Sequence, residues 1–475
     1  MKLNKEILRL AVPSILAGIT VPLVGMVDIA VAGHLPGGSS AALIGSISVG
    51  TMLFDLLYWN FTFLRAGTGG LTAQAYGRQM ADQVGHDGLM PGTNASVMPG
   101  SDRASAQPGR ILGRALRIAL LSGLALIALQ WVVVQLAFLV VRCSPEVQQF
   151  ATRYFYIRIW AAPATLSLFA FKGWFIGLQD SVRPMVADLL VNGLNMLLSA
   201  ALAFGWAGLP AMGFDGVAVG TVMAQWSGFA YCLSAARHRY AWNVSTLCSD
   251  SSANPPEQNQ PFFSLNRDLF LRSVGMIAVY IGFTVLSARY GDLMLAVSAI
   301  LMKFLMLFSY FTDGFAFAGE ALTGRFIGES SPEGVQSTVR QTFAWSWAMA
   351  GGFMLLYGLG GTPLLRLMTS APEVVEAGRQ FFPWLLLMPL IGCPAFLWDG
   401  IFIGATASRD LRNSTLLCAV GFFAVWFVGL ALGADSTPER AIHLLMGAYF
   451  THLAVRALYL TLRYRPAVLL PLTAK

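Results

Sequence analysis

Charged residues are scarce in this sequence, and their scarcity excludes most classes of soluble protein. Of 475 residues, only 12% are Asp, Glu, Lys or Arg, whereas 56% are hydrophobic. Soluble domains carry about 25% charged residues. A shortage this large indicates that most of the chain's surface faces lipid. The formal net charge of +7 therefore bears on membrane orientation, and no nucleic-acid partner is expected.

Several chemical motifs are also absent. The five cysteines include no C-x-x-C pair and the five histidines show no ligand spacing, so we expect neither a disulfide framework nor a metal site. No G-x-x-x-x-G-K-[ST] loop is present, which excludes a chain that hydrolyses ATP with its own phosphate-binding loop. We expect no cofactor. A membrane-embedded enzyme is the rival class, but no residue pattern points to its chemistry.

Long apolar segments are what the chain does have. About 20 apolar residues span a bilayer as a helix, and twelve segments reach this length. They cover residues 7–33, 41–68, 111–141, 152–177, 184–207, 215–236, 268–290, 293–322, 341–368, 378–404, 412–433 and 440–463. The sequence therefore predicts an all-α polytopic membrane protein.

Polar stretches divide the predicted spans into two sets of six. The segment 237–267 is rich in Pro and amides, which predicts a cytoplasmic linker. It separates an N-terminal six-helix lobe, 1–236, from a C-terminal six-helix lobe, 268–475. A second polar stretch, 78–110, predicts a cytoplasmic loop inside the first lobe.

Lys and Arg are distributed unevenly around these spans. If both termini are cytoplasmic, most of the 31 Lys and Arg residues fall in cytoplasmic segments. Basic residues favour that side of the membrane. The distribution predicts a multi-pass protein of a bacterial inner membrane with its N and C termini in the cytoplasm.

Two short motifs recur in the second half of the chain, in the same order. Gly173–Gly177 reads G-W-F-I-G and Gly400–Gly404 reads G-I-F-I-G, while Leu71–Gly77 is matched by Leu322–Gly328. Two related halves around a central cavity are the plan of many secondary transporters. The repeat therefore predicts a transporter built from two pseudo-symmetric lobes.

Ionisable residues inside the predicted spans are candidates for function, because a charge is costly to bury in hydrocarbon. Asp28 ends a face of small residues in the first span, which suits the wall of a cavity. Pro13 and Pro22 interrupt the same helix and predict a hinge. The alternative is structural, with Asp28 pairing with an arginine of a neighbouring span.

The span 184–207 carries a polar stripe. Asp188, Asn192, Asn195 and Ser199 project from one helical face. Such a stripe either joins helices through hydrogen bonds or forms a hydrated wall that binds a proton or cation. We favour the second interpretation.

The second lobe also carries buried charge. Asp313 and Glu320 lie on the span 293–322 with Lys303 nearby. These residues predict either a second polar site or a structural pair between the lysine and a carboxylate. We also expect Asp399 to form a structural pair with Lys172.

The sequence resembles the multidrug and toxic compound extrusion (MATE) transporters, in particular their bacterial DinF-like branch. The resemblance is carried by Val27–Leu35, Phe63–Gly77, Gly173–Asp180 and, most specifically, Tyr310–Leu322. It covers almost the whole chain apart from the 78–110 stretch and residues 245–262.

The resemblance implies a fold of two six-helix bundles that form a V around a central cleft. It implies export of cationic or amphipathic small molecules in exchange for H⁺ or Na⁺, by alternating access. A monomer is expected, because such a fold encloses its own cleft. A flippase for lipid-linked saccharides is the alternative function within the superfamily, but it would line the cleft with cations, whereas this lining is acidic and amide-rich.

The resemblance also implies roles for particular residues. Asp28 is the coupling carboxylate, the first span bends at Pro13, and Thr221 completes a polar pocket. The family pattern Asn-x-x-x-Asp falls on Asn195 and Ser199, so its second carboxylate is missing from this chain. That departure favours H⁺ over Na⁺ only mildly.

Overall fold

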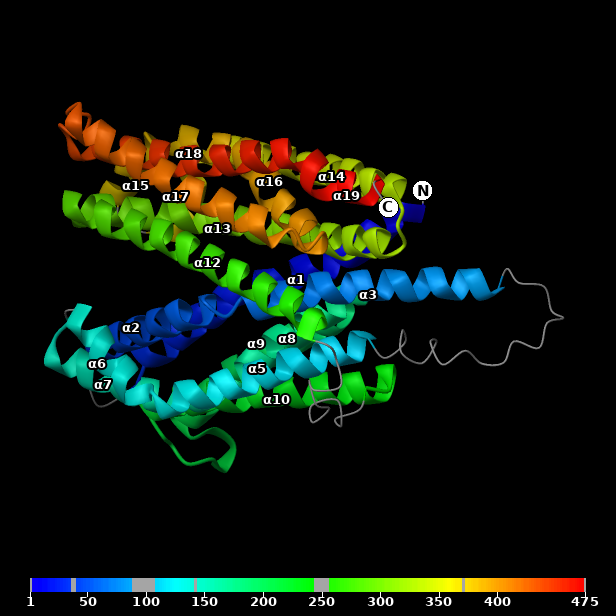
Figure 1. Ribbon diagram of the computed structural model, residues 1–475. Helices are drawn as coiled ribbons and strands as arrows, with labels where there is room; N and C mark the ends of the chain where they lie inside the picture. The colour runs from blue at the N-terminus through cyan, green and yellow to red at the C-terminus, as the bar shows by residue number, and fades with distance from the viewer. Residues whose placement is uncertain are drawn as a thin grey trace. The chain divides into compact units, whose positions relative to one another are not determined.

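The structure is a computed structural model that describes residues 2–35, 40–87, 107–140, 143–242, 256–369 and 372–473. Every regular element within these ranges is helical (Figure 1). The first half of the chain forms α1 (Lys2–Gly33), α2 (Ser40–Trp59), α3 (Phe63–Asp87), α5 (Gln107–Ala128), α6 (Gln130–Val140), α7 (Pro145–Arg158), α8 (Ala162–Gly177), α9 (Val182–Phe204) and α10 (Phe214–Tyr240). The second half forms α12 (Pro256–Ser287), α13 (Asp292–Gly328), α14 (Pro332–Met368), α15 (Pro372–Arg379), α16 (Phe382–Gly404), α17 (Ser408–Ala431), α18 (Pro438–Tyr464) and α19 (Leu470–Thr473).

In the part of the chain that the structure describes, 11 helical segments are long and apolar enough to cross a membrane. The chain is therefore a multi-pass membrane protein. Each of the twelve predicted spans falls on helical sequence, but the span 215–236, which is α10, is not among the 11. This helix carries polar side chains such as Thr221 and three basic residues in its last turn, so it is less apolar than its neighbours.

Two predicted polar connections are shorter than their composition suggested. α3 continues through Asp87 and α5 begins at Gln107, so both ends of the predicted 78–110 loop are helical. The predicted 237–267 linker is likewise helical up to Tyr240 and again from Pro256. The remaining parts, 88–106 and 243–255, lie outside the described residues. A helix satisfies its backbone hydrogen bonds internally, so it can continue with polar side chains beyond the apolar stretch.

The chain divides into two compact units. Unit 1 comprises Met1–Ile15, Ala73–Thr93 and Pro256–Lys475, and unit 2 comprises Leu16–Thr72 and Asn94–Pro255. The predicted lobes, 1–236 and 268–475, keep all of α1 and α3 in the first lobe. In the structure each of these two helices is divided between the units.

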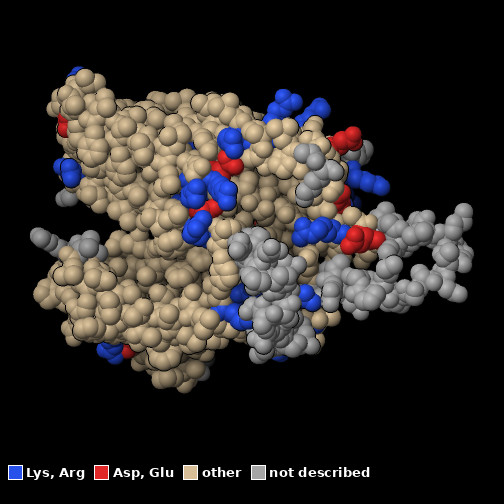
Figure 2. Space-filling model, in the orientation of Figure 1, with Lys and Arg blue, Asp and Glu red and all other residues tan. Residues whose placement is uncertain are grey.

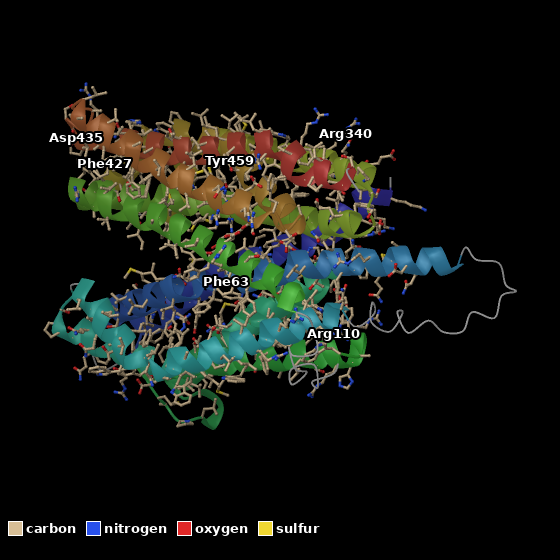
Figure 3. All side chains as sticks on the ribbon, in the orientation of Figure 1. Phe63, Arg110, Arg340, Phe427, Asp435 and Tyr459 are labelled. Atoms are coloured by element: carbon tan, nitrogen blue, oxygen red, sulfur yellow. The ribbon has the colours of Figure 1, made fainter. Side chains whose placement is uncertain are left out.

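Unit 1 packs its long helices around an aromatic core. α13, α14, α16, α17 and α18 run lengthwise through it (Figure 1). Phe308, Phe353 and Tyr357 are buried there, and the Tyr357 hydroxyl donates a hydrogen bond to the Phe304 carbonyl oxygen at 2.8 Å. Figure 3 shows Arg340 and Asp435 at opposite ends of this unit. These two charged residues are therefore separated by most of the length of the helices.

Unit 2 brings α9 and α10 into close contact through glycine. A Cβ atom at Gly216 would lie 2.6 Å from the Ala203 nitrogen, and one at Gly220 would lie 2.6 Å from the Ser199 nitrogen. Such distances leave no room for a side chain, so only glycine permits this approach. The contact fixes Thr221 of α10 against the polar stripe of α9.

The outer surface of the helices is apolar. Large hydrophobic side chains remain exposed, including Leu139, Leu359, Leu367 and Leu432 at 77–85%. Uncharged residues cover most of the face drawn in Figure 2. Exposed apolar surface on this scale is what a lipid environment requires.

The repeated G-x-F-I-G motif makes the same contact in each unit. In unit 2, a side chain at Gly173 would overlap the carbonyl oxygen of Arg65. In unit 1, a side chain at Gly400 would overlap the carbonyl oxygen of Ala316. Arg65 and Ala316 themselves precede the two copies of the second repeated motif by six residues. The internal repeat therefore has the same packing role in both copies.

The second repeated motif forms a reciprocal contact within unit 1, where the middle of α3 crosses the end of α13. Gly77 lies against the carbonyl of Arg325, and Gly328 lies against the carbonyl of Gln74. Gly77 corresponds to Gly328 in the repeat, and Gln74 corresponds to Arg325. Exchanging the two copies therefore turns one contact into the other, as at an isologous interface. A side chain at Gly324 would meet the Cβ atom of Ala73, the residue at the same place in the first copy. A local pseudo-twofold axis therefore passes through this small-residue crossing.

We expect Gly77→Ala to destabilise the protein, because the added methyl group would overlap backbone rather than a flexible side chain. Overpacking a tight contact costs about 1–3 kcal/mol. Thermal unfolding in detergent, followed by tryptophan fluorescence, measures the effect. Gly351→Ala is the matched control, because a Cβ atom at that position meets nothing within 4 Å. Equal melting temperatures for the two variants would contradict the tight crossing.

Candidate functional site

The polar stripe of α9 begins with side chains that join helices. Asp188 forms an ion pair with Lys172 of α8. Asn192 Nδ2 donates to Thr20 Oγ1 of α1 at 2.6 Å. The expected pair of Lys172 with Asp399 is therefore wrong, since the neighbouring helix α9 supplies the nearer carboxylate. Asp188 thus has a cationic partner of its own, and its part in a coupling site stays a prediction.

The other half of the stripe forms a buried polar pocket. Asn195 and Ser199 are buried, at 3% and 0% exposure, and Asn195 Nδ2 donates to Thr221 Oγ1 at 2.8 Å. The Thr221 hydroxyl donates to the Val217 carbonyl at 3.0 Å. The sequence therefore placed Asn195, Ser199 and Thr221 together correctly.

Asp28 joins this pocket from α1. Its side chain is buried at 5% exposure, and its carboxylate interacts with the Ser199 hydroxyl and with the positive charge of Arg158. Among the described residues, neither Asp28 Oδ1 nor Asn195 Oδ1 has a hydrogen-bond partner. Two buried acceptor oxygens without partners are costly in a purely structural cluster. The arrangement suits a group that gains and loses a proton or a cation.

Arg158 of α7 also belongs to this pocket. As an ionisable residue inside a predicted span it is a functional candidate, but its position in the sequence predicted no specific role. Its guanidinium donates to the Tyr154 hydroxyl at 2.9 Å and to Thr51 Oγ1 at 3.4 Å, and it lies 4.8 Å from the centre of the Phe54 ring. It also interacts electrostatically with Asp28 and Asp55. A basic residue inside a predicted span was the available signal, together with a tyrosine one helical turn before it.

The predicted structural alternative for Asp28 was an ion pair with a neighbouring arginine. Arg158 influences Asp28 through its charge, but no contact within ion-pair distance joins the two side chains in the described part of the chain. The arginine instead directs its hydrogen bonds to neutral hydroxyl groups. Within the described residues, Asp28 therefore has no contact ion pair.

The two prolines predicted as hinges lie within an unbroken α1. Pro13 lacks the backbone N–H that would bond the Arg9 carbonyl, which weakens the helix at that turn. The division between the two compact units falls between Ile15 and Leu16, directly after Pro13. Pro22 lies inside the segment that belongs to unit 2. Bending at either proline stays a prediction.

The predicted second polar site is only partly assembled. Glu320 is fully buried in α13 and Asp313 is half-buried, whereas Lys303 of the same helix is exposed. Asp313 interacts electrostatically with Arg456 of α18. Lys303 therefore projects from a different face of α13 than Glu320 does, and its part in a second polar site stays a prediction.

Unit 1 instead centres its buried charge on Asp399 of α16. Arg456 and Arg272 both form ion pairs with this carboxylate, and Arg272 Nη2 donates to Asp399 Oδ2 at 2.5 Å. Arg456 is 1% exposed. Arg272, near the start of a predicted span, is also mostly buried, with 12% of its side chain exposed. The two arginines hold three helices together around one buried anion.

Metal chemistry finds no support in the residues that the structure describes. Within those ranges, no group of three His, Cys, Asp or Glu side chains could hold a metal ion. The identity of the coupling ion stays a prediction.

Comparison with known proteins connects this chain to one family. The MatE family model matches residues 104–201 and 269–428. The chain is 31% identical over 463 residues to DNA damage-inducible protein F of Escherichia coli, covering 97% of this chain and 92% of that protein. It is 23% identical to a probable multidrug resistance protein NorM of Thermotoga maritima, covering 90% of this chain and 84% of that protein.

Solved structures share the fold. The Vibrio cholerae MATE transporter VcmN in its bent form superposes with a TM-score of 0.79 at 17% identity, covering 98% of this chain and 97% of that chain. A MATE transporter in complex with MaD3S gives a TM-score of 0.78 at 16% identity, covering 100% and 97%. At these identities the likeness shows the fold alone.

We expect Asp399→Asn to destabilise the protein strongly, because it leaves two buried arginines without their anion. Breaking a buried ion pair by removing one partner costs about 3–5 kcal/mol. The melting temperature in detergent measures the loss. Glu376→Gln is the control, because its pair with Arg379 is exposed, at 74% and 54%, and such pairs contribute about 0–1 kcal/mol. Similar melting temperatures for both variants would show that the arginines do not depend on Asp399.

Proposed function

We propose a proton-coupled export function on one premise: this chain belongs to the MATE family. Members of that family are membrane transporters rather than enzymes. In our proposal the chain exports cationic or amphipathic small molecules in exchange for protons. It does so across a bacterial inner membrane, with both termini in the cytoplasm.

Asp28 carries the proposal. It is a buried carboxylate without a contact ion pair to any described residue, beside hydroxyl and amide groups that fit either protonation state. In its ionised form, Asp28 attracts a cationic substrate or holds water. In its protonated form it is neutral and favours a closed, drier pocket. Substrate and proton then favour different states, which exchange requires because a ligand with equal affinity for both states shifts nothing.

The surroundings of Asp28 favour a proton over sodium as the coupling ion. A proton needs a single oxygen atom, whereas a metal cation needs several oxygens and compensating negative charge. Ser199 supplies a neutral hydroxyl where the family pattern has a carboxylate. Arg158 already places a positive charge near Asp28, and a second cation would be repelled by it. In our proposal the positive charge of Arg158 therefore makes sodium binding at Asp28 unfavourable.

The alternative, a flippase for lipid-linked saccharides, would need cationic groups available for a pyrophosphate. Arg272 and Arg456 are both bound to Asp399, and Arg158 is bound to Tyr154 and Thr51. The buried arginines thus already have partners, and this favours an exporter of cations.

The first test replaces Asp28 with Asn and measures efflux of ethidium, a cationic dye, from proteoliposomes with an imposed pH gradient. We expect wild-type efflux to follow the gradient and Asp28→Asn to lose it, because the amide cannot bind a proton. The variant should keep the elution profile and melting temperature of the wild type. Asp435→Asn is the control, since that residue follows α17 in unit 1 and lies outside the pocket. Unchanged efflux by Asp28→Asn would refute the proposed role.

The second test restores the missing carboxylate. An imposed sodium gradient should drive no ethidium efflux in the wild type, whereas Ser199→Asp should create sodium-driven efflux by giving the pocket a second negative charge to balance Arg158 and the ion.

Ser199→Asn is the matched control, because it adds the same volume without charge and should not respond to sodium. Sodium-driven efflux by the wild type would overturn proton selectivity. Sodium responses that are equal in the two variants would show that the added volume, rather than the charge, matters.

A further inference from the structure

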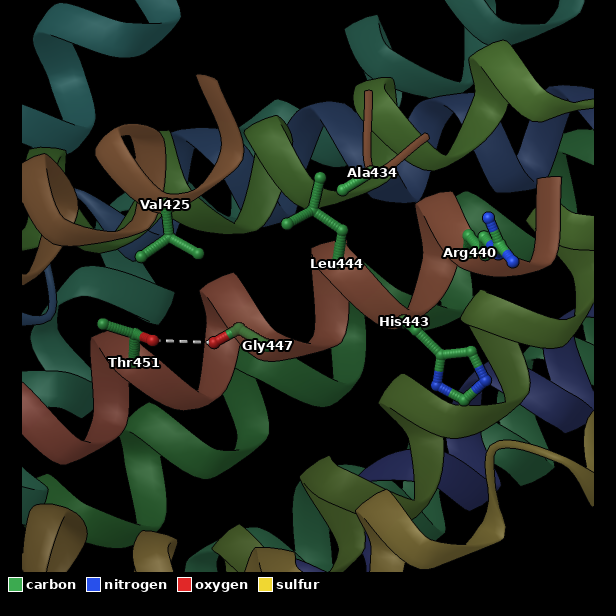
Figure 4. Close-up of a pocket in the computed structure, with 7 residues that line it drawn as sticks. All are labelled: Val425, Ala434, Arg440, His443, Leu444, Gly447 and Thr451. Carbon is green, nitrogen blue, oxygen red and sulfur yellow. Dashed lines mark hydrogen bonds between the residues drawn. The ribbon is translucent and has the colours of Figure 1, made fainter. Parts of the chain in front are cut away.

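A groove between α17 and α18 of unit 1 takes no part in the proposed exchange. Its volume is about 500 Å³, and Val425 and Ala434 form one wall (Figure 4). The opposite wall is a single stripe of α18, from Arg440 through Leu444 and Gly447 to Thr451. These positions are spaced four, three and four residues apart, so they share one helical face.

The inner part of the groove offers no unpaired polar side chain that an occupant would have to hydrogen-bond. Val425 and Leu444 are apolar, and Gly447 adds no side chain to the lining. The one hydroxyl, of Thr451, donates to the Gly447 carbonyl at 2.8 Å within its own helix (Figure 4). A hydrocarbon chain fits such a lining, because it needs no hydrogen bonds.

The end of the groove near the start of α18 has the opposite character. Trp384 Nε1 donates to His443 Nδ1 at 2.9 Å. Because the indole nitrogen can only donate, the neutral His443 ring carries its proton on Nε2, which is a second donor. Arg440 Nη1 donates to the Ser436 hydroxyl at 3.0 Å, and no carboxylate of the described residues lies within ion-pair distance of its guanidinium. Arg440 and His443 therefore offer donors to an anion.

We propose that this groove binds one glycerophospholipid, with an acyl chain along α18 and the phosphate at Arg440 and His443. The stripe from Arg440 to Thr451 rises about 16 Å along the helix. One leaflet contributes about half of the roughly 30 Å hydrocarbon core. The length of the groove along α18 thus matches the hydrocarbon thickness of one leaflet. Its hydrogen-bond donors, Arg440 and His443, lie at the end where the lipid headgroup would be. In the predicted topology that end lies on the outer side of the membrane.

The bilayer is the source of the occupant, because the groove opens on lipid-facing surface. Val420, Phe427 and Val428 of α17 are 57–65% exposed, and Leu432 after it is 80% exposed. A lipid therefore reaches the groove without crossing polar surface. A second copy of the chain and an amphipathic substrate are the other occupants that the experiment must distinguish.

Native mass spectrometry of delipidated protein in detergent tests the proposal, with phosphatidylglycerol added as the probe. We expect one saturable lipid per chain. Val425→Trp should fill the groove, and Arg440→Gln should remove a phosphate contact. Each should weaken binding about tenfold, as expected for losing one charge-assisted hydrogen bond or its equivalent in packing.

Two matched controls keep the test independent of folding. Val420→Trp makes the same substitution on the exposed face of α17, and Arg379→Gln removes an exposed arginine outside the groove. Both should bind lipid as the wild type does. A neutral diacylglycerol should bind more weakly than phosphatidylglycerol, and inorganic phosphate should not compete with it.

Three results would overturn the proposal. The first is equal lipid binding by Val425→Trp and Val420→Trp. The second is a dimer of the chain that lipid does not dissociate, which would make a second copy the occupant. The third is displacement of the bound lipid by ethidium at the concentrations used for efflux, which would make the groove a substrate site. None of these measurements depends on transport, so failure of the lipid site and failure of proton-coupled export are separate outcomes.

Discussion

An ionised carboxylate inside a membrane-spanning bundle must be compensated by the protein itself, because lipid supplies neither water nor counter-ions. Three aspartates meet this demand in three ways. Asp399 receives two arginines and Asp188 receives one lysine, so both are fixed as structural anions. Asp28 receives a hydroxyl contact and the more distant charge of Arg158. Of these three, Asp28 is compensated least, and our proposal therefore assigns the change of protonation to it.

Glycine contacts place that carboxylate in its surroundings. Gly216 and Gly220 bring α10 against α9 and so set Thr221 beside Asn195. The reciprocal crossing of α3 and α13 stands directly after Thr72, where the chain passes from unit 2 to unit 1. Small residues therefore lie both at the Asp28 pocket and next to the point where the chain passes from unit 2 to unit 1. Backbone contacts of this kind are rigid, so motion, where it occurs, is expected at the neighbouring turns rather than within the contacts.

The sequence predicted the positions of the helices better than it predicted which side chains contact one another. Hydropathy located the helices, and the four-residue spacing of α9 grouped Asn195 with Ser199. It could not show that Asp188 would meet Lys172, because pairing depends on how each helix is rotated about its axis. For the same reason the sequence could not show that the Lys303 side chain would be exposed on α13. Arg158 and Arg272 went unassigned because a single basic residue carries no spacing signal, and polar helix ends were read as loops because hydropathy ignores backbone hydrogen bonding.

The central claim is that proton binding and substrate binding compete at Asp28. The most direct measurement adds ethidium to purified protein in weakly buffered detergent solution and follows the pH with an indicator dye. The account predicts that the wild type releases protons as the dye binds, and that Asp28→Asn binds the dye without releasing them, because binding that favours the ionised carboxylate must displace its proton. Dye binding by the wild type without proton release, or equal release by the variant, would contradict it.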